Sequence, residues 1–255
     1  TLMKILSGTI APGGEHARVI VSPGIKIGYL DQEPDFLPGD TIRDAIMTID
    51  IPEIKAWGDH HKALLTSDAH ALQQAAIQMD DHHAWDIEST IMQMLDQLHL
   101  YDIEKPIQQL SGGQKKRLAM AMIILSRPDV LVLDEPTNHL DMSMVEWLEN
   151  FFLMPDKTFL TVTHDRYFLD RVCNQIIELD RGKLRPYQGN YSDYLEKKAL
   201  LNESMQSSQE KAKQLMKKEL DWIRRMPKAR TTKNKARIDN FEHVKAAAAR
   251  VLYQD

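Results

Sequence analysis

The sequence predicts an α/β domain followed by a basic helical segment. Within the first 191 residues, short all-apolar runs that suit buried strands occur between longer stretches with helical periodicity. In residues 192–255, apolar side chains recur at steps of three and four, as in amphipathic helices. Charge divides near the same place. Residues 196–250 contain 15 Lys and Arg against seven Asp and Glu, whereas the rest of the chain contains 17 against 30. We therefore expect two modules.

The composition is that of an ordinary globular protein. Hydrophobic residues make up 43% and charged residues 27% of the 255 residues, which is enough for a sizeable core. No run approaches about 18 consecutive apolar residues, so the sequence predicts no membrane span. Cys173 is the only cysteine and cannot form an internal disulfide. It indicates the reducing cytoplasm, and we interpret it as a small core residue rather than a reactive thiol.

The first strand is expected just before Gln32, within the segment Gly28–Pro34. The stretch that follows, about 36–100, is expected to be a helical insertion, because strand signals are absent and apolar residues recur near helical spacing. These apolar residues are Trp57, Leu64, Leu65, Leu72, Ala76 and Met79. The stretch is also rich in histidine, but no pair has the spacing of a strong metal site. We interpret the histidines as part of a solvated helical face.

Residues 110–141, LSGGQKKRLAMAMIILSRPDVLVLDEPTNHLD, form the most specific pattern in the chain. Ser111, Gly112 and Gly113 place little side chain at the start of a helix, where N–H groups and the helix dipole favour anions. Val130–Leu133 is all apolar and predicts a strand that is buried on both faces. Asp134 and Glu135 follow at its carboxyl end, where α/β sheets bind ligands. The pattern predicts a phosphate site in which one carboxylate holds Mg²⁺ and the other polarises a water.

A further strand is expected at Thr158–Val162, and His164 follows it. Because neighbouring parallel strands end at the same edge of a sheet, this imidazole is expected near Asp134. An isolated histidine at a strand end is usually structural. The interpretation of His164 as a site residue therefore depends on the surrounding pattern.

Together these residues resemble the ATP-binding cassette (ABC) family. Leu110–Gln114 resembles its signature motif and Val130–Glu135 its Walker B strand. Gln32 matches the family's Q-loop glutamine, and His164 matches its switch histidine. The run from Glu135 to Asp141, EPTNHLD, resembles the ABC-F subfamily, whose members act on ribosomes and lack membrane domains. Two other stretches, Asp81–Trp85 and Arg230–Arg237, are similar to the Uup-like branch of that subfamily.

The resemblance implies a P-loop NTPase-like ABC nucleotide-binding domain over residues 1–191, with a helical arm at about 36–100. Residues 192–255 are then the α-helical interdomain linker. The intact protein is expected to be an ATPase that uses ATP and Mg²⁺. A second ABC domain of the same full-length chain is expected to close a head-to-tail sandwich, in which the signature motif faces ATP held by the partner cassette.

The resemblance also implies a role for each site residue. Glu135 corresponds to the catalytic base or water-orienting carboxylate, and His164 to the contact with the γ-phosphate. Asp134 and Gln32 correspond to the Mg²⁺ ligands. The residues implied in ATP binding are Thr1, Gln32, Ser111, Gly112, Gly113, Gln114, Asp134 and Asp141.

The phosphate-binding loop of such proteins, G-x-x-x-x-G-K-[ST], occurs nowhere in the sequence. The opening residues, Thr1–Gly8, resemble the helix that continues this motif. We therefore expect the chain to be a fragment that begins within the loop. We also expect it to hydrolyse ATP negligibly on its own.

The basic segment is expected to form a helical hairpin. Ser192 can cap a first helix, Pro227 interrupts the pattern, and a second helix is expected to follow, with the tip near 226–235. The tip is cationic and free of acids, whereas solvated coiled coils usually alternate in sign. Its cations are Arg224, Arg225, Lys228, Arg230, Lys233, Lys235 and Arg237. This pattern favours contact with nucleic-acid phosphates, and the ABC-F resemblance favours tRNA or ribosomal RNA over DNA.

Two other functions fit a cassette of this kind. One is the ATPase subunit of a membrane transporter, and the other is a DNA-associated ATPase. A basic helical hairpin has little use in a transporter subunit, so the sequence favours a ribosome-associated protein over the first alternative. The hairpin does not exclude DNA.

Overall fold

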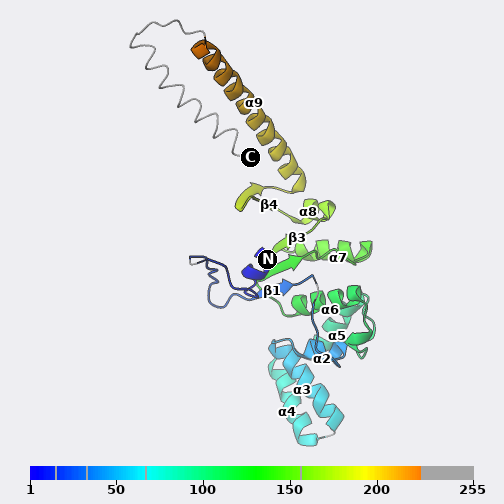
Figure 1. The fold of residues 1–255 in the computed structure, drawn as a ribbon. Helices are drawn as coiled ribbons and strands as arrows, with labels where there is room; N and C mark the ends of the chain where they lie inside the picture. Colours follow the sequence, from blue (N-terminus) through cyan, green and yellow to red (C-terminus); the bar gives the residue numbers. More distant parts are fainter. Residues whose placement is uncertain (15, 33, 67, 156, 225–255) are drawn as a thin grey trace. The chain divides into compact units, whose positions relative to one another are not determined.

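The computed structural model describes residues 1–224 except 15, 33, 67 and 156 (Figure 1). The chain divides into two compact units, Thr1–Val172 and a second unit that begins at Cys173. The sequence placed the boundary later, at 191/192. The difference arises because a β-hairpin at 175–188 packs with the long helix that follows it and so belongs to the second unit. None of the described helices is long and apolar enough to cross a bilayer.

The core of the first unit is a parallel three-stranded sheet in the order β1-β2-β3. Its strands are β1 (Ile27–Leu30), β2 (Val130–Asp134) and β3 (Thr158–Val162). The middle strand is β2, and its residues Leu131, Val132 and Leu133 are each 3% exposed. The predicted strand buried on both faces is therefore confirmed. Because all three strands run the same way, their carboxyl ends meet at one edge of the sheet.

Four helices pack around this sheet: α1 (Leu2–Leu6), α6 (Gly112–Leu125), α7 (Met142–Phe152) and α8 (Arg166–Val172). Helix α6 lies along β1, and Gly28 allows the close approach. A Cβ at Gly28 would lie 2.8 Å from Cγ2 of Ile123 and 2.9 Å from Cγ of Pro128. On the other side, Phe152 of α7 packs against Phe159 of β3 with ring centroids 4.5 Å apart.

The range predicted to be a helical insertion contains α2 (Ile42–Met47), α3 (Pro52–Thr66), α4 (Ala69–Asp81) and α5 (Ile87–Gln97). Helices α3 and α4 lie side by side and form one end of the first unit (Figure 1). Trp57 and Met79 are buried, as their spacing indicated. Leu64 and Leu65 are exposed instead, at 53% and 74%, because they lie near the solvent end of α3.

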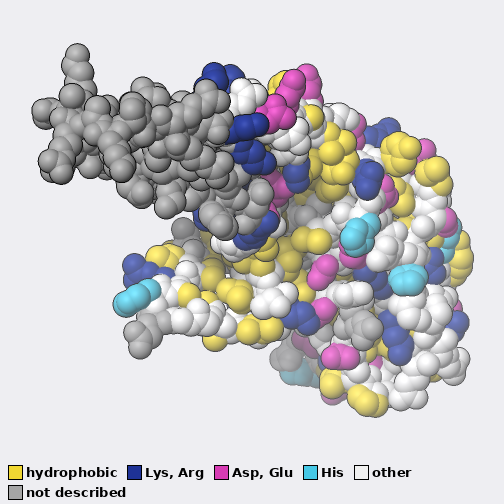
Figure 2. All heavy atoms as spheres, turned by 45° about the horizontal axis from the view of Figure 1, so that its top comes forward, with side chains coloured by type: hydrophobic (Ala, Val, Ile, Leu, Met, Phe, Trp, Pro, Cys, Tyr) yellow, Lys and Arg dark blue, Asp and Glu magenta, His cyan; other side chains and the backbone are white. Residues whose placement is uncertain are grey.

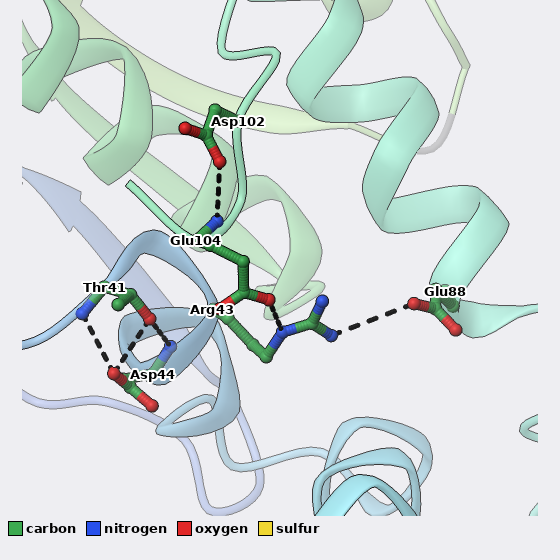
Figure 3. A network of polar contacts seen from close by, with 6 residues as sticks. All are labelled: Thr41, Arg43, Asp44, Glu88, Asp102 and Glu104. Atoms are coloured by element: carbon green, nitrogen blue, oxygen red, sulfur yellow. Dashed lines mark hydrogen bonds and ion pairs between the residues drawn. The ribbon is translucent and has the colours of Figure 1, made fainter. Parts of the chain in front are cut away.

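Arg43 holds this helical part together (Figure 3). Its guanidinium bonds to Glu104 over 2.6 Å and reaches Glu88 of α5 at 3.8 Å. It also lies over the ring of Trp57 in α3, 5.3 Å from the ring centroid. Beside it, Thr41 and Asp44 form a reciprocal cap at the start of α2. One arginine thus connects three helical elements to the loop that leads towards the signature motif.

The second unit contains an antiparallel hairpin, β4 (Gln175–Asp180) and β5 (Lys183–Gln188), and the helix α9 (Tyr191–Arg224). Arg181 and Gly182 both have positive φ, as a two-residue hairpin turn requires. Helix α9 was predicted to be capped by Ser192. The residue that caps it is Asn190, which exchanges hydrogen bonds with Asp193, each 3.0 Å long. The second helix and tip of the predicted hairpin lie outside the described residues.

Four polar side chains join the base of α9 to the hairpin. Glu178 of β4 accepts hydrogen bonds from the hydroxyls of Tyr187 and Tyr194, each 3.1 Å long, and from Lys198.

Cys173, the first residue of the second unit, has a protonated thiol near neutral pH, because burial raises its pKa to about 11. This protonation state agrees with the interpretation of Cys173 as unreactive.

Candidate functional site

Glu135 is the centre of the candidate site. It follows β2 directly, is 9% exposed and has a left-handed backbone, with φ of 51°. Its N–H donates to the carbonyl of Val162 in β3 over 2.8 Å. One oxygen of its carboxylate accepts the backbone N–H of His164 over 3.2 Å. The Glu135 peptide therefore turns out of the strand while its carboxylate remains tied to the end of β3.

The structure brings the predicted pair Glu135 and His164 together. His164 Nε2 lies 3.7 Å from Glu135 Oε1, and the rest of the imidazole is exposed to solvent. In the same two segments, the hydroxyls of Thr137 and Thr163 are 3.2 Å apart. The ends of β2 and β3 are thus cross-linked at the side-chain level. An exposed imidazole next to a buried carboxylate is free to contact a ligand at this edge.

Asp134 and Gln32 are presented at the same edge. Leu30 of β1 pairs with Leu133 of β2, so the residues that follow each strand emerge side by side. Carboxylate and amide oxygens are ligands that Mg²⁺ accepts, and Mg²⁺ usually keeps waters and substrate phosphates as its other ligands. Among the described residues, no three His, Cys, Asp or Glu side chains converge as a self-sufficient metal site. The donors fit an ion that is held jointly by protein and phosphate.

The signature segment forms the start of α6. The hydroxyl of Ser111 accepts the N–H of Gln114 over 3.2 Å, and the side chain of Gln114 accepts the N–H of Ser111 over 3.0 Å. The two glycines differ in a way that the sequence did not separate. A Cβ at Gly112 would meet nothing within 4 Å, whereas one at Gly113 would lie 3.1 Å from Cβ of His139. Gly112 leaves the backbone open to a ligand, and Gly113 allows internal packing.

A cavity of about 310 Å³ lies between three of the predicted motifs. Gln32 and Pro34 line one part of it, and Gly112, Lys115 and Lys116 of α6 line another. Asn138 and His139, which follow the Walker B strand, complete the lining. Segments that are about 80 residues apart in sequence therefore share one cavity.

Two further predicted residues occupy structural positions. Asp141 caps α7, because its carboxylate accepts the N–H of Met144 over 3.0 Å and the hydroxyl of Ser143 over 2.7 Å. The Ser143 hydroxyl is the main cause that lowers the Asp141 pKa, and His99 Nδ1 lies 3.3 Å away. Thr1 precedes α1, a helix that packs against β2. Contacts of Thr1 and Asp141 with ATP stay predictions.

Lys116 is a site residue that the sequence reasoning missed. It is 3% exposed, and its Nζ donates to the main-chain carbonyl of Glu135 over 2.7 Å. Burial lowers the Lys116 pKa, while nearby carboxylates, chiefly that of Glu135, act in the opposite direction. The available signal was helical spacing. Lys116 shares a face of α6 with Ala119 and Met120, which are both buried, so a lysine there lies on the core face.

The predicted nucleic-acid contacts are described in part. Arg224 is the last residue of α9, and the other six cations of the predicted tip lie outside the described residues. Figure 2 shows Lys and Arg side chains interspersed with Asp and Glu side chains on the described surface. Helix α9 itself contains seven Lys and Arg against six Asp and Glu, so it is a mixed-charge helix.

The chain matches a family profile described as ABC transporter over residues 1–138, and a second profile with the same description, the extension, over 177–252. The first match covers more than half of the 255 residues and includes β1, the signature motif and the Walker B strand. The chain therefore belongs to the ABC family, and its fold is that of an ABC nucleotide-binding domain with additional helices.

Curated relatives align over nearly the whole chain. It is 39% identical to the uncharacterized ABC transporter ATP-binding protein YfmR of Bacillus subtilis strain 168, over 96% of this chain and 40% of the relative. It is also 39% identical to the energy-dependent translational throttle protein EttA of Haemophilus influenzae, over 96% of this chain and 45% of the relative. The chain thus spans less than half the length of these relatives.

Among solved structures, one described as the ATP binding subunit of an ABC transporter is 16% identical. The match covers 64% of this chain and 59% of that one, with a TM-score of 0.47.

Proposed function

We propose that the full-length protein is an ATP-hydrolysing ABC-F protein that acts on the ribosome during translation. The observation that carries this proposal is the continuous alignment with translational throttle proteins through both the cassette and the extension. The extension favours this function over that of a transporter subunit. The sequences of residues 81–85 and 230–237 support membership of the Uup-like branch of the ABC-F subfamily.

The geometry supports a role for Glu135 as catalytic base or water-orienting group. Its carboxylate is nearly buried, and the His164 N–H donates to one of its oxygens, so its direction is set before a ligand arrives. The His164 imidazole is exposed beside it and suits a contact with the terminal phosphate. When bound, Mg·ATP would supply the phosphoryl group that is transferred to water, and Asp134 with Gln32 would hold the ion. Catalysis would then rest on positioning and charge stabilisation.

The signature segment supports a head-to-tail sandwich with a second ABC domain of the same full-length protein. Gly112 leaves the backbone at the start of α6 open, and the N–H groups there favour an anion. The capping box of Ser111 and Gln114 fixes this helix start. We propose that this surface contacts ATP held by the second domain, and that ATP binding closes the sandwich while hydrolysis releases it.

The chain by itself is proposed to bind MgATP weakly and to hydrolyse it negligibly. No G-x-x-x-x-G-K-[ST] loop occurs in the 255 residues, so the backbone cradle and lysine for the β- and γ-phosphates are not provided. Calorimetric titration of the chain with MgATP tests this directly. Micromolar affinity would contradict it.

Trapping of the ATP-bound state tests the proposed function. In the full-length protein, Glu135→Gln should bind ATP without hydrolysing it and should therefore accumulate on ribosomes in an ATP-dependent manner. Co-sedimentation with ribosomes, with and without ATP, measures this. Glu146→Gln, an exposed carboxylate on α7, is the matched control and should behave as wild type. If Glu135→Gln turns over ATP within threefold of wild type, Glu135 is not the catalytic residue. If the variant is inactive but does not sediment with ribosomes in an ATP-dependent manner, the proposed action on the ribosome is wrong.

A further inference from the structure

Lys116 is placed at a cost that the fold alone does not explain. Only three charged side chains are classed as buried among the described residues: those of Lys116, Glu135 and Glu149. Glu149 has an ion-pair partner, because Arg171 lies 2.8 Å away. The Lys116 ammonium instead donates to a neutral main-chain carbonyl, that of Glu135, over 2.7 Å, and the carboxylates of Glu135, Asp134 and Asp31 act on it without an ion pair. Removing an ammonium group from water is costly, and a single carbonyl replaces little of its hydration.

The carbonyl that Lys116 contacts belongs to Glu135, a residue with an unusual backbone conformation. With φ of 51°, Glu135 lies in the left-handed region, which non-glycine residues adopt uncommonly. The peptide groups on both sides of Glu135 are held by hydrogen bonds. The N–H of Glu135 donates to Val162, and its carbonyl accepts from Lys116 and, at 3.3 Å, from the N–H of Asn138. Rotation of this peptide would swing the Glu135 carboxylate away from the His164 N–H.

We propose that Lys116 is a positioning residue that holds the backbone of Glu135 in its left-handed conformation and so directs the Glu135 carboxylate towards the reacting water. This inference rests on the proposed catalytic role of Glu135. The Lys116 side chain also connects the signature motif with the end of the Walker B strand. Lys116 lies five residues after Ser111 on α6, so a shift of the signature end of this helix changes the bond to the Walker B peptide.

The alternative is that Lys116 merely fills space in the core, and methionine distinguishes the two. Lys116→Met keeps a long unbranched side chain but removes the donor, and it also removes a buried charge. If Lys116 only fills space, the variant should be at least as stable as wild type and fully active. If Lys116 positions Glu135, the variant should fold but lose turnover. A misplacement of about 1 Å at a catalytic group costs up to roughly 100-fold in rate.

The test measures kcat, KM for ATP and Tm in the full-length protein for wild type, Lys116→Met, Glu135→Gln and the double variant. We expect Lys116→Met to lower kcat at least about tenfold while KM stays within about twofold. Lys116→Arg, which retains a cationic donor, should recover part of the loss. Lys105→Met, a lysine outside the site, should match wild type. If Lys116→Met does not fold, Lys116→Leu replaces it under the same criterion, because it also lacks a donor.

The double variant shows whether Lys116 acts through Glu135. We expect its residual turnover to equal that of Glu135→Gln, because the carboxylate that Lys116 directs is already gone. A further tenfold drop would mean that Lys116 acts independently and would overturn the inference. A kcat of Lys116→Met within twofold of wild type, with Glu135→Gln inactive, would overturn the inference alone. If Glu135→Gln is active, the proposed catalytic role of Glu135, on which this inference rests, is wrong.

Discussion

The two units of the chain hold charged side chains in different ways. In the first, Lys116 and Glu135 are buried and are fixed by main-chain hydrogen bonds. In the second, Glu178 and Lys198 lie in a partly exposed network at the base of α9, and the basic tip is evident from the sequence alone. Chemistry on a phosphoryl group requires side chains held in place, whereas attraction to a phosphate backbone requires charge near a surface. Substitutions of these charged side chains should therefore affect rate in the first unit, and affinity or stability in the second.

After Glu135→Gln, the largest effect is expected at His164. In the full-length protein, His164→Ala should lower kcat by roughly 100-fold, because it removes an imidazole aimed at developing charge but leaves the backbone N–H that orients Glu135. Steady-state ATPase assays measure this. Tyr167→Ala, an exposed residue in the next helix, serves as the control and should retain wild-type turnover. A His164→Ala protein with unchanged kcat would show that the buried carboxylate acts without it.

The next effect is expected at the basic tip. We predict that changing all seven cations between Arg224 and Arg237 to Ala weakens ribosome or tRNA association without altering basal ATP turnover. Each lost phosphate contact should also reduce the slope of log affinity against log salt by roughly 0.7 to 0.9.

Ribosome co-sedimentation across a salt series measures both quantities. The control neutralises four lysines within α9: Lys211, Lys213, Lys217 and Lys218. This control should change affinity and slope much less, because these lysines are flanked by Glu210 and Glu219, whereas the tip contains no acid. Equal slopes for wild type and the seven-Ala variant would make the tip an ordinary solvated surface. Crosslinking to RNA against DNA in cells separates the two nucleic acids.

A smaller effect separates the two glycines of the signature motif. Gly113→Ala should leave the first unit about 1 kcal/mol less stable than Gly112→Ala does, because its new Cβ would lie 3.1 Å from Cβ of His139 and offset the gain in helix propensity. Gly112→Ala meets no atom within 4 Å and should leave the free energy of unfolding within about 0.5 kcal/mol of wild type. Denaturant unfolding of both variants measures the difference. Equal losses would indicate that the packing of His139 is not what constrains Gly113.

The smallest effect is expected in the network at the base of α9. Lys198 is the main cause that lowers the pKa of Glu178 below its ordinary 4.5, with Tyr194 and Tyr187 contributing. A lowered carboxyl pKa contributes stability above the unfolded pKa, and this contribution is lost as pH falls through the folded value. Glu178→Gln should therefore lower stability at pH 7 by up to about 1 kcal/mol.

Melting temperatures across pH test this prediction. The wild-type and Glu178→Gln curves should converge below about pH 4.5, where the carboxylate becomes protonated. Glu196→Gln on α9 is the control. A difference that persists unchanged into acid would assign the loss to packing rather than to charge.

Local sequence was sufficient for the elements that carry the site. The all-apolar run Val130–Leu133 is typical of a buried strand, and a serine followed by two glycines and a glutamine is typical of a capped helix start. Parallel strands that end at one edge predicted His164 near Asp134 at the end of β2, and the structure places its Nε2 3.7 Å from the next residue, Glu135. These features follow from short-range propensity and the hydrophobic pattern.

Tertiary structure decided what depends on distant neighbours. The left-handed backbone at Glu135 and the hydrogen bond from Lys116 to its carbonyl arise where α6, β2 and β3 meet, and no local pattern specifies that meeting. Likewise, the space at Gly113 is tight because His139 lies against it, and the residue that caps α9 is Asn190 rather than Ser192, because Asn190 and Asp193 exchange hydrogen bonds. A sequence lists donors and acceptors, but burial and partner choice are properties of the folded chain as a whole, because they depend on which segments exclude water from one another.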